Sequence, residues 1–178
     1  METYIFDVGD VFLRDMRKRS KSPGEVVMVI RRPGGKVLLS TKEFYPPGVF
    51  RLPTGKMNPG EDPESALIRE VHEETGFRAR GARLLDVIRC TARNQAEAVD
   101  FNSYIYILGE IDGEPKSLDP DEQITEFREV EPCELKQIAT QLRELPDDWR
   151  DWGQFRAIAH EFVYKKLCPH YKNCCSNV

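Results

Sequence analysis

Two runs of apolar, largely β-branched residues stand close together in the first quarter of the chain. The first covers residues 25–32 (EVVMVIRR) and the second covers residues 36–41 (KVLLST). Residues 33–35 (PGG) separate them and are typical of a tight turn. We therefore predict a β-hairpin over residues 25–41.

Later parts of the chain contain short extended runs and longer runs with a period near 3.6 residues, which predict strands and helices respectively. The predicted strands cover residues 49–52, 84–90, 103–111 and 126–130. The predicted helices cover residues 63–75, 134–145 and 154–167. Strands that come first, one helix inserted among them and helices at the end predict an α/β (or α+β) domain with an α/β/α arrangement, and they argue against a βαβ repeat.

Clear end signals bracket the helix predicted over residues 63–75. Asp62 is a favourable N-cap residue, and Pro63 suits the first helical position. Gly76 stands where a helix ends in a left-handed residue. We therefore expect the helix to begin and end at these residues.

Three carboxylates share one face of this helix. At about 100° per residue, Glu70, Glu73 and Glu74 fall within an arc of about 100°. Their mutual repulsion opposes helix formation, so a positive partner should compensate for it. A divalent cation is one such partner, because Mg²⁺ and Mn²⁺ prefer carboxylate oxygens. Arg69 is another resource, since it can bridge to Glu61 in the preceding loop. An acidic, solvated helix face is the alternative.

Residues 55–77 (GKMNPGEDPESALIREVHEETGF) resemble the Nudix box, Gly-x5-Glu-x7-Arg-Glu-apolar-x-Glu-Glu-x-Gly-apolar, and match it at every specified position. The order of the predicted strands extends the resemblance over about residues 24–145. It implies a Nudix-like α/β/α sandwich with a mixed sheet. It also implies metal-dependent hydrolysis of a diphosphate bond in a nucleoside diphosphate derivative or a nucleoside triphosphate, with Mg²⁺ or Mn²⁺ as the cofactor. A non-catalytic module that binds a nucleotide or RNA is the alternative.

The resemblance also implies roles for individual residues in metal binding. Glu70 and Glu74 would be the leading ligands, and Glu73 an additional one. The main-chain carbonyl of Thr54 or Gly55 would complete the set.

Catalysis needs two further groups besides the metal ligands. By the same resemblance, Glu61 and Arg69 would hold the loop to the helix. Glu70 is the first candidate for the general base, while Glu126 resembles a late-loop glutamate that some family members recruit, and Glu122 is a third candidate. The general base therefore remains open between these glutamates.

Substrate contacts are harder to assign. Arg31, Arg51 and Lys56 are candidates to bind phosphates, with a surface cation as the alternative at each position. Three aromatic residues are candidates to stack on a base, although alternating aromatics on strands usually belong to the core; these are Phe101, Tyr104 and Phe127. A stripe that begins Trp149, Trp152, Phe155 predicts a helix packed on the sheet, with a homodimer seam as the alternative.

Composition limits the function classes. The chain has 178 residues, and 26 Lys and Arg against 30 Asp and Glu give a net charge of -4, so binding to nucleic acid is not expected. The sequence lacks a run of apolar residues long enough for a signal peptide or a membrane span. Five cysteines are interpreted as reduced thiols, which favours a cytoplasmic protein.

The expected organisation is one domain over residues 24–167, with an N-terminal extension (residues 1–23) and a flexible cysteine-containing tail (residues 168–178). The base-rich segment 14–21 is interpreted as a solvated connector, with a phosphate or nucleic-acid patch as the alternative. Cysteines and a histidine in the tail offer soft zinc ligands, but a frayed end is the favoured interpretation.

Overall fold

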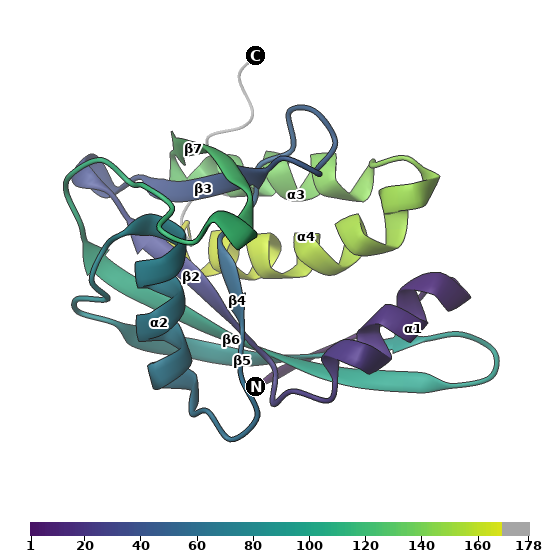
Figure 1. Ribbon diagram of the computed structural model, residues 1–178. Coiled ribbons are helices and arrows are strands. Elements are labelled where there is room, and N and C mark those ends of the chain that lie inside the picture. Colours follow the sequence, from purple (N-terminus) through teal and green to yellow (C-terminus); the bar gives the residue numbers. More distant parts are fainter. Residues whose placement is uncertain (169–178) are drawn as a thin grey trace, which may run out of the picture.

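A computed structural model describes residues 1–168, which form a mixed β-sheet covered by helices on both faces (Figure 1). The strand order is β1-β5-β6-β2-β3-β7, and β4 pairs with β2 beside this path. The pairs β1–β5 and β2–β6 are parallel and the others antiparallel. The strands are β1 (Glu2–Asp7), β2 (Glu25–Arg31), β3 (Val37–Lys42), β4 (Thr54–Lys56), β5 (Arg83–Arg93), β6 (Ala98–Glu110) and β7 (Ile124–Val130).

Four α-helices and three short 3-10 helices accompany the sheet in the part of the chain that the structure describes. The α-helices are α1 (Asp10–Arg19), α2 (Pro63–Thr75), α3 (Leu135–Arg143) and α4 (Asp147–Leu167). The 3-10 helices are η1 (Pro33–Gly35), η2 (Pro120–Glu122) and η3 (Pro132–Glu134). None of the described helices is both long enough and apolar enough to cross a bilayer. The predicted α/β/α arrangement is confirmed.

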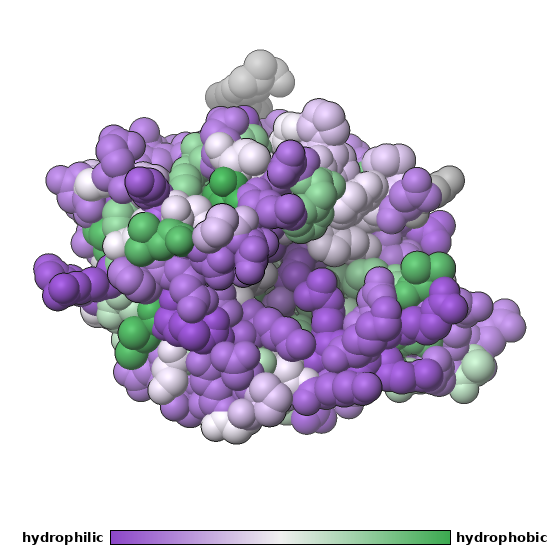
Figure 2. All heavy atoms as spheres, in the orientation of Figure 1, coloured by the Kyte–Doolittle hydropathy of each residue, from purple (hydrophilic) through white to green (hydrophobic). Residues whose placement is uncertain are grey.

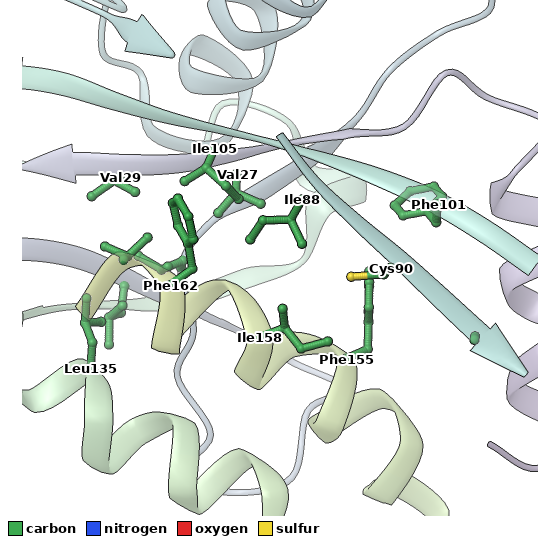
Figure 3. Close-up of a cluster of buried hydrophobic side chains, with 14 of the residues drawn as sticks. Val27, Val29, Ile88, Cys90, Phe101, Ile105, Leu135, Phe155, Ile158 and Phe162 are labelled. Atoms are coloured by element: carbon green, nitrogen blue, oxygen red, sulfur yellow. The ribbon is translucent and has the colours of Figure 1, made fainter. Parts of the chain in front are cut away.

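Strand β2 is buried on both faces, which explains its unbroken apolar sequence. Val27 and Val29 belong to the cluster that packs against α1 and α4 (Figure 3), whereas Val26 and Met28 belong to the cluster under α2. The sheet is therefore the middle layer, and β2 is a central strand that packs against helices on both faces.

The helix predicted over residues 63–75 is confirmed as α2 with the same ends. The Asp62 carboxylate accepts hydrogen bonds from the backbone N–H groups of Glu64 (3.1 Å) and Ser65 (3.0 Å). Gly76 closes the helix with φ of 71°, in the left-handed region. These local contacts fix which side chains of α2 face the sheet.

The N-terminal segment, expected as an extension outside the domain, forms part of the fold, and most of the expected connector 14–21 belongs to helix α1. Strand β1 pairs in parallel with β5, and α1 buries Leu13 and Met16 in the core shared with α4. The bases of residues 14–21 lie mostly on the outer surface of α1. Because the partner of β1 lies more than 80 residues away, no local pattern announced the strand.

Other boundaries also differ from the predictions, and three of the differences change an element. Residues 49–52 form no strand, and only Arg51 makes an isolated bridge, to Ser40. The helix predicted over residues 134–145 is split into η3 and α3. Helix α4 begins at Asp147 rather than at residue 154. It contains Gly153 because α4 passes so close to Leu142 that a Cβ at this position would lie 2.0 Å from the Leu142 carbonyl oxygen.

The predicted cysteine-containing tail falls largely outside the described residues. The zinc-ligand candidates His170, Cys174 and Cys175 lie there. Cys168 is described, and its Sγ lies 2.6 Å from Sγ of Cys133. The predicted free end at Cys168 is therefore a contact between the end of α4 and η3.

Buried His160 connects α4 to the segment that leads into β4. Its Nε2 accepts a hydrogen bond from the Leu52 N–H (3.0 Å), and its Nδ1 lies 2.8 Å from the Arg156 carbonyl oxygen. Burial lowers the pKa of His160 to about 4, below the ordinary value near 6.5. The neutral imidazole is thus the form that the fold requires.

This depressed pKa predicts a pH dependence of stability. Between pH 6.5 and 4 the unfolded chain binds a proton on this histidine that the folded chain excludes. Lowering the pH through this range should therefore reduce the free energy of unfolding by up to about 3 kcal/mol. In His160→Gln, which cannot titrate, the free energy of unfolding measured with denaturant should depend less steeply on pH in this range than it does in the wild type. Equal slopes would contradict the assignment.

Candidate active site

Strand β4 brings the backbone of the 55–77 segment against the acidic face of α2. A Cβ added to Gly55 would lie 2.0 Å from both Cγ and Cδ of Glu70. The Glu70 side chain therefore passes directly over Gly55, in a space that only glycine leaves open. This contact directs the carboxylate toward the edge of β4.

Three carboxylates from α2 and η2 converge beside β4. Glu70, Glu74 and Glu122 each offer an oxygen within 4.8 Å of the others. Lys42, at the end of β3, forms an ion pair with Glu122, and its Nζ lies 3.3 Å from Oε1 of Glu74. Neither oxygen of Glu74 accepts a hydrogen bond from the described residues, although this side chain is fully buried.

The protonation of this cluster follows from its burial. Burial raises the pKa of Glu74 to about 8 and that of Glu70 to about 7. At Glu122 burial acts in the same direction, but the Lys42 ammonium outweighs it and holds the pKa below its ordinary value. Lys42 pairs with Glu122 and Glu74, and Arg69 pairs with Glu70. Neither buried oxygen of Glu74 has a hydrogen-bond partner among the described residues, which fits a hard cation. The donor set therefore suits Mg²⁺ or Mn²⁺.

Arg69 ties the loop before α2 to the helix. Its Nε and Nη2 donate to the two carboxylate oxygens of Glu61, each at 2.9 Å. Nη2 also donates to the Lys56 carbonyl (3.0 Å), and Nη1 donates to Glu70 (2.7 Å) and Glu73 (2.9 Å). The hydrogen bond from Arg69 is the main reason that the pKa of Glu61 is lowered. The predicted bridge is confirmed, and it extends to two further acids.

The clamp predicts a combined loss of stability and activity in Arg69→Ala. The carboxylate of Glu61 and the carbonyl of Lys56 lose their charged donor, so the free energy of unfolding should fall by about 1–3 kcal/mol. The loop that carries Gly55 should shift, and kcat should fall with it. Arg69→Lys keeps the charge and loses the forked guanidinium, so its stability and kcat should lie between those of the wild type and Arg69→Ala. Wild-type kinetics and melting temperature in Arg69→Ala would contradict this role.

Not every predicted ligand joins the cluster. Glu73 is one-third exposed and binds Arg69 rather than lying with Glu70 and Glu74. Glu126, predicted as catalytic, is exposed on β7 opposite Thr41 and is absent from the cluster, so this prediction needs correction. The turn at η2 brings Glu122 into the place that Glu126 was expected to occupy.

The predicted phosphate contacts divide in the same way. Arg51 and Lys56 line a cleft of about 230 Å³ next to the carboxylates, together with Thr54, Gly55 and Glu70. Figure 2 shows this face of the molecule hollowed at its centre, with mainly hydrophilic side chains around the hollow.

Arg31 does not reach this cleft, which corrects its assignment as a substrate-binding residue. It is exposed at the far end of β2, paired with Val37, whereas Glu25 at the near end lines the cleft. Six residues of extended strand place the two ends about 20 Å apart. The direction of β2 therefore places Glu25, and not Arg31, at the cleft.

The three aromatic candidates mostly serve the core. Phe101 is buried in the cluster against α4, although it also contributes to the cleft wall. Tyr104 and Phe127 pack against the cluster under α2. The core interpretation of these residues is therefore confirmed.

Sequence reasoning missed a buried ion pair at the back of the cleft. Nη1 of Arg156 on α4 lies 2.8 and 2.9 Å from the two carboxylate oxygens of Glu25, and the Ser103 hydroxyl donates to the same carboxylate. Lys42 and Arg19 also line the cleft. These residues come from five separate elements, so no spacing in the sequence connects them.

Comparison with known proteins supports the motif. The NUDIX domain model matches residues 21–153, well over half of the chain. The chain belongs to the NUDIX family. An ADP-ribose pyrophosphatase of Methanocaldococcus jannaschii is 32% identical over 142 residues, which cover 78% of this chain and 81% of that protein. An ADP-ribose pyrophosphatase of Bacillus subtilis is 36% identical over 67 residues, which cover 36% of each chain.

The NUDIX fold extends to solved structures. A MutT NUDIX hydrolase from Burkholderia pseudomallei has a TM-score of 0.52 and 26% identity, and the alignment covers 79% of this chain and 96% of that one.

The first curated relatives are matched over about a third of their length or less, and the NAD-capped RNA hydrolase NUDT12 of Homo sapiens is matched over 12% of its length. Strand β1 and all of α1 precede the matched residues, and most of α4 follows them.

Proposed function

We propose that this NUDIX protein hydrolyses the diphosphate bond of a nucleoside diphosphate derivative in a metal-dependent reaction. The observation that carries the proposal is the buried cluster of Glu70, Glu74 and Glu122, whose Glu74 oxygens have no hydrogen-bond partner among the described residues. The cluster opens on a cleft lined by cationic side chains, which suits a phosphate chain.

The residues that would hold Mg²⁺ or Mn²⁺ are Glu70, Glu74 and Glu122, with the carbonyl of Thr54 or Gly55 as a main-chain ligand. When bound, the ion neutralises charge on phosphate oxygens and lowers the pKa of a water molecule. Glu73 stands outside this set, and its carboxylate keeps Arg69 in place.

Residues of the cleft would position the substrate and receive the proton of the attacking water. The guanidinium of Arg51 is held by the Tyr45 hydroxyl (2.7 Å) and the Thr54 hydroxyl (2.9 Å), so it is fixed at the cleft wall for a phosphate oxygen. Lys56, on the same wall, adds a second positive charge. For the general base we retain Glu70 and replace Glu126 by Glu122, because both Glu70 and Glu122 line the cleft.

A substrate panel tests this function. Purified protein is incubated with ADP-ribose, other nucleoside diphosphate derivatives and nucleoside triphosphates, with Mg²⁺, with Mn²⁺, or with EDTA, and the products are separated. We expect a mononucleotide product with either metal and none with EDTA. Saturable binding without turnover of any compound would instead support the non-catalytic alternative.

A further inference from the structure

A second hollow lies beside the cleft, between α1 and the first turns of α4, with a volume of about 480 Å³. Phe12, Asp148 and Trp149 belong to its lining, and Arg19 and Trp152 line both this groove and the cleft. The two hollows therefore meet at Arg19 and Trp152. A molecule whose phosphates lie at the carboxylate cluster can therefore extend past Arg19 and Trp152 into the groove and remain in contact with the protein.

The junction of the two hollows carries a cluster of three aromatic rings, whose planes are tilted or nearly perpendicular to one another. Trp149 and Trp152 lie edge to face with ring centroids 5.2 Å apart, and Tyr45 lies 4.9 Å from Trp152. Both tryptophans are only half-buried, unlike Phe155 of the same stripe, which is in the core. The predicted packing of the stripe on the sheet is therefore confirmed from Phe155 onward, through Ile158 and Phe162, but not for the two tryptophans. Partly exposed indole rings offer flat surfaces on which a heterocycle stacks.

Charged side chains of opposite sign lie around these rings, with Arg19 at the junction with the cleft and aspartates along the groove. Within residues 1–168, the half-buried guanidinium of Arg19 has no carboxylate or carbonyl partner, and it faces the hollow on the side of the cleft. Asp148 lines the groove outside the cleft, as do Asp10, Asp15 and Asp151. Asp148 is exposed and likewise makes no hydrogen bond or ion pair with the described residues. An anion is thus favoured near the cleft, and N–H donors are favoured deeper in the groove.

We infer that this groove binds the nucleobase of the substrate, with Arg19 holding the phosphate next to the nucleoside. The inference rests on the proposed function and extends it to the kind of substrate. A purine fits best, because its two fused rings can stack on the partly exposed face of one indole and its edge carries N–H donors for Asp148. Helix α1, which precedes the matched NUDIX residues, then contributes directly to substrate recognition.

Intrinsic fluorescence tests this inference directly, because Trp149 and Trp152 are the two tryptophans of the chain. GMP, AMP and ribose 5-phosphate are titrated into metal-free protein, and free N-acetyltryptophanamide corrects for absorbance and collisions. We expect saturable quenching with GMP and AMP and none with ribose 5-phosphate. Quenching that does not saturate, or that matches the free amide, would overturn the inference.

Variants separate the two contacts. Arg19→Ala should weaken GMP binding about tenfold or more and leave the affinity for guanosine unchanged, because guanosine lacks the phosphate. Asp148→Asn should weaken both. Arg14→Ala, an exposed arginine on the same helix outside both hollows, is the matched control and should bind like the wild type. Equal GMP affinity in Arg19→Ala and Arg14→Ala would overturn the role of Arg19.

The measurement needs neither metal nor turnover, so its failure differs from a failure of the proposed function. A chain that hydrolyses nucleotide derivatives but shows no saturable quenching keeps its function and loses this subsite. A chain that shows the quenching but hydrolyses none of the panel keeps the subsite and loses the function.

Discussion

Replacing Glu74 by Gln is expected to lower kcat by about 10²- to 10⁴-fold, which corresponds to several kcal/mol of lost metal-based stabilisation. The side chain keeps its volume and its position but loses the charge that a hard cation requires. Its burial raises the pKa of Glu74 to about 8, so the glutamine resembles the protonated form that the metal-free protein favours. The fold should therefore survive the change, and the metal-free melting temperature should not fall.

Glu126→Gln is the matched control for this variant. Glu126 is an exposed carboxylate on β7, outside the cluster, so its kcat should stay within about twofold of the wild type. Glu122→Gln should behave like the Glu74 variant if the cluster is the reactive centre. A large loss in Glu126→Gln together with wild-type activity in Glu122→Gln would restore the assignment that the sequence suggested.

Gly55→Ala is expected to be nearly as damaging, for a purely steric reason. A Cβ at this position would lie 2.0 Å from two carbon atoms of Glu70, so the Glu70 carboxylate must leave the cluster or β4 must move. Overpacking of this kind destabilises by about 1–3 kcal/mol, and the displaced ligand should lower kcat by orders of magnitude. Steady-state kinetics and denaturant unfolding of the same preparation measure both effects.

A double variant identifies the contact responsible. Glu70→Ala removes the atoms that clash, so Gly55→Ala/Glu70→Ala should regain stability relative to Gly55→Ala while remaining inactive. Additive losses of stability in the double variant would show that Gly55 acts through another neighbour.

The parts of the fold that the sequence predicted well are those whose signals are local. Helix α2 begins and ends as expected because Asp62 and Gly76 act on the backbone within one turn. The bridge between Arg69 and Glu61 also follows from a fixed spacing within one loop and helix. Short-range contacts of this kind leave little room for the tertiary structure to override the pattern.

The parts that were missed depend on distant partners or on the direction of the chain. Strand β1 exists because β5 accepts it as a parallel neighbour, and no residue near β1 signals that pairing. Glu122 replaces Glu126 because Gln123 adopts a left-handed conformation (φ 53°) that ends η2, a turn that its sequence does not announce. Arg31 fails because the cleft lies at the other end of its strand.

Metal titration tests the central claim, that the buried carboxylates bind a divalent ion. Calorimetric titration of Mn²⁺ is carried out on wild type, Glu74→Gln and Glu126→Gln at one pH near 7.5. We predict saturable binding in the wild type and in Glu126→Gln, with proton release because the pKa values of Glu70 and Glu74 are raised, and loss of that binding in Glu74→Gln. Identical Mn²⁺ binding in wild type and Glu74→Gln would contradict the account.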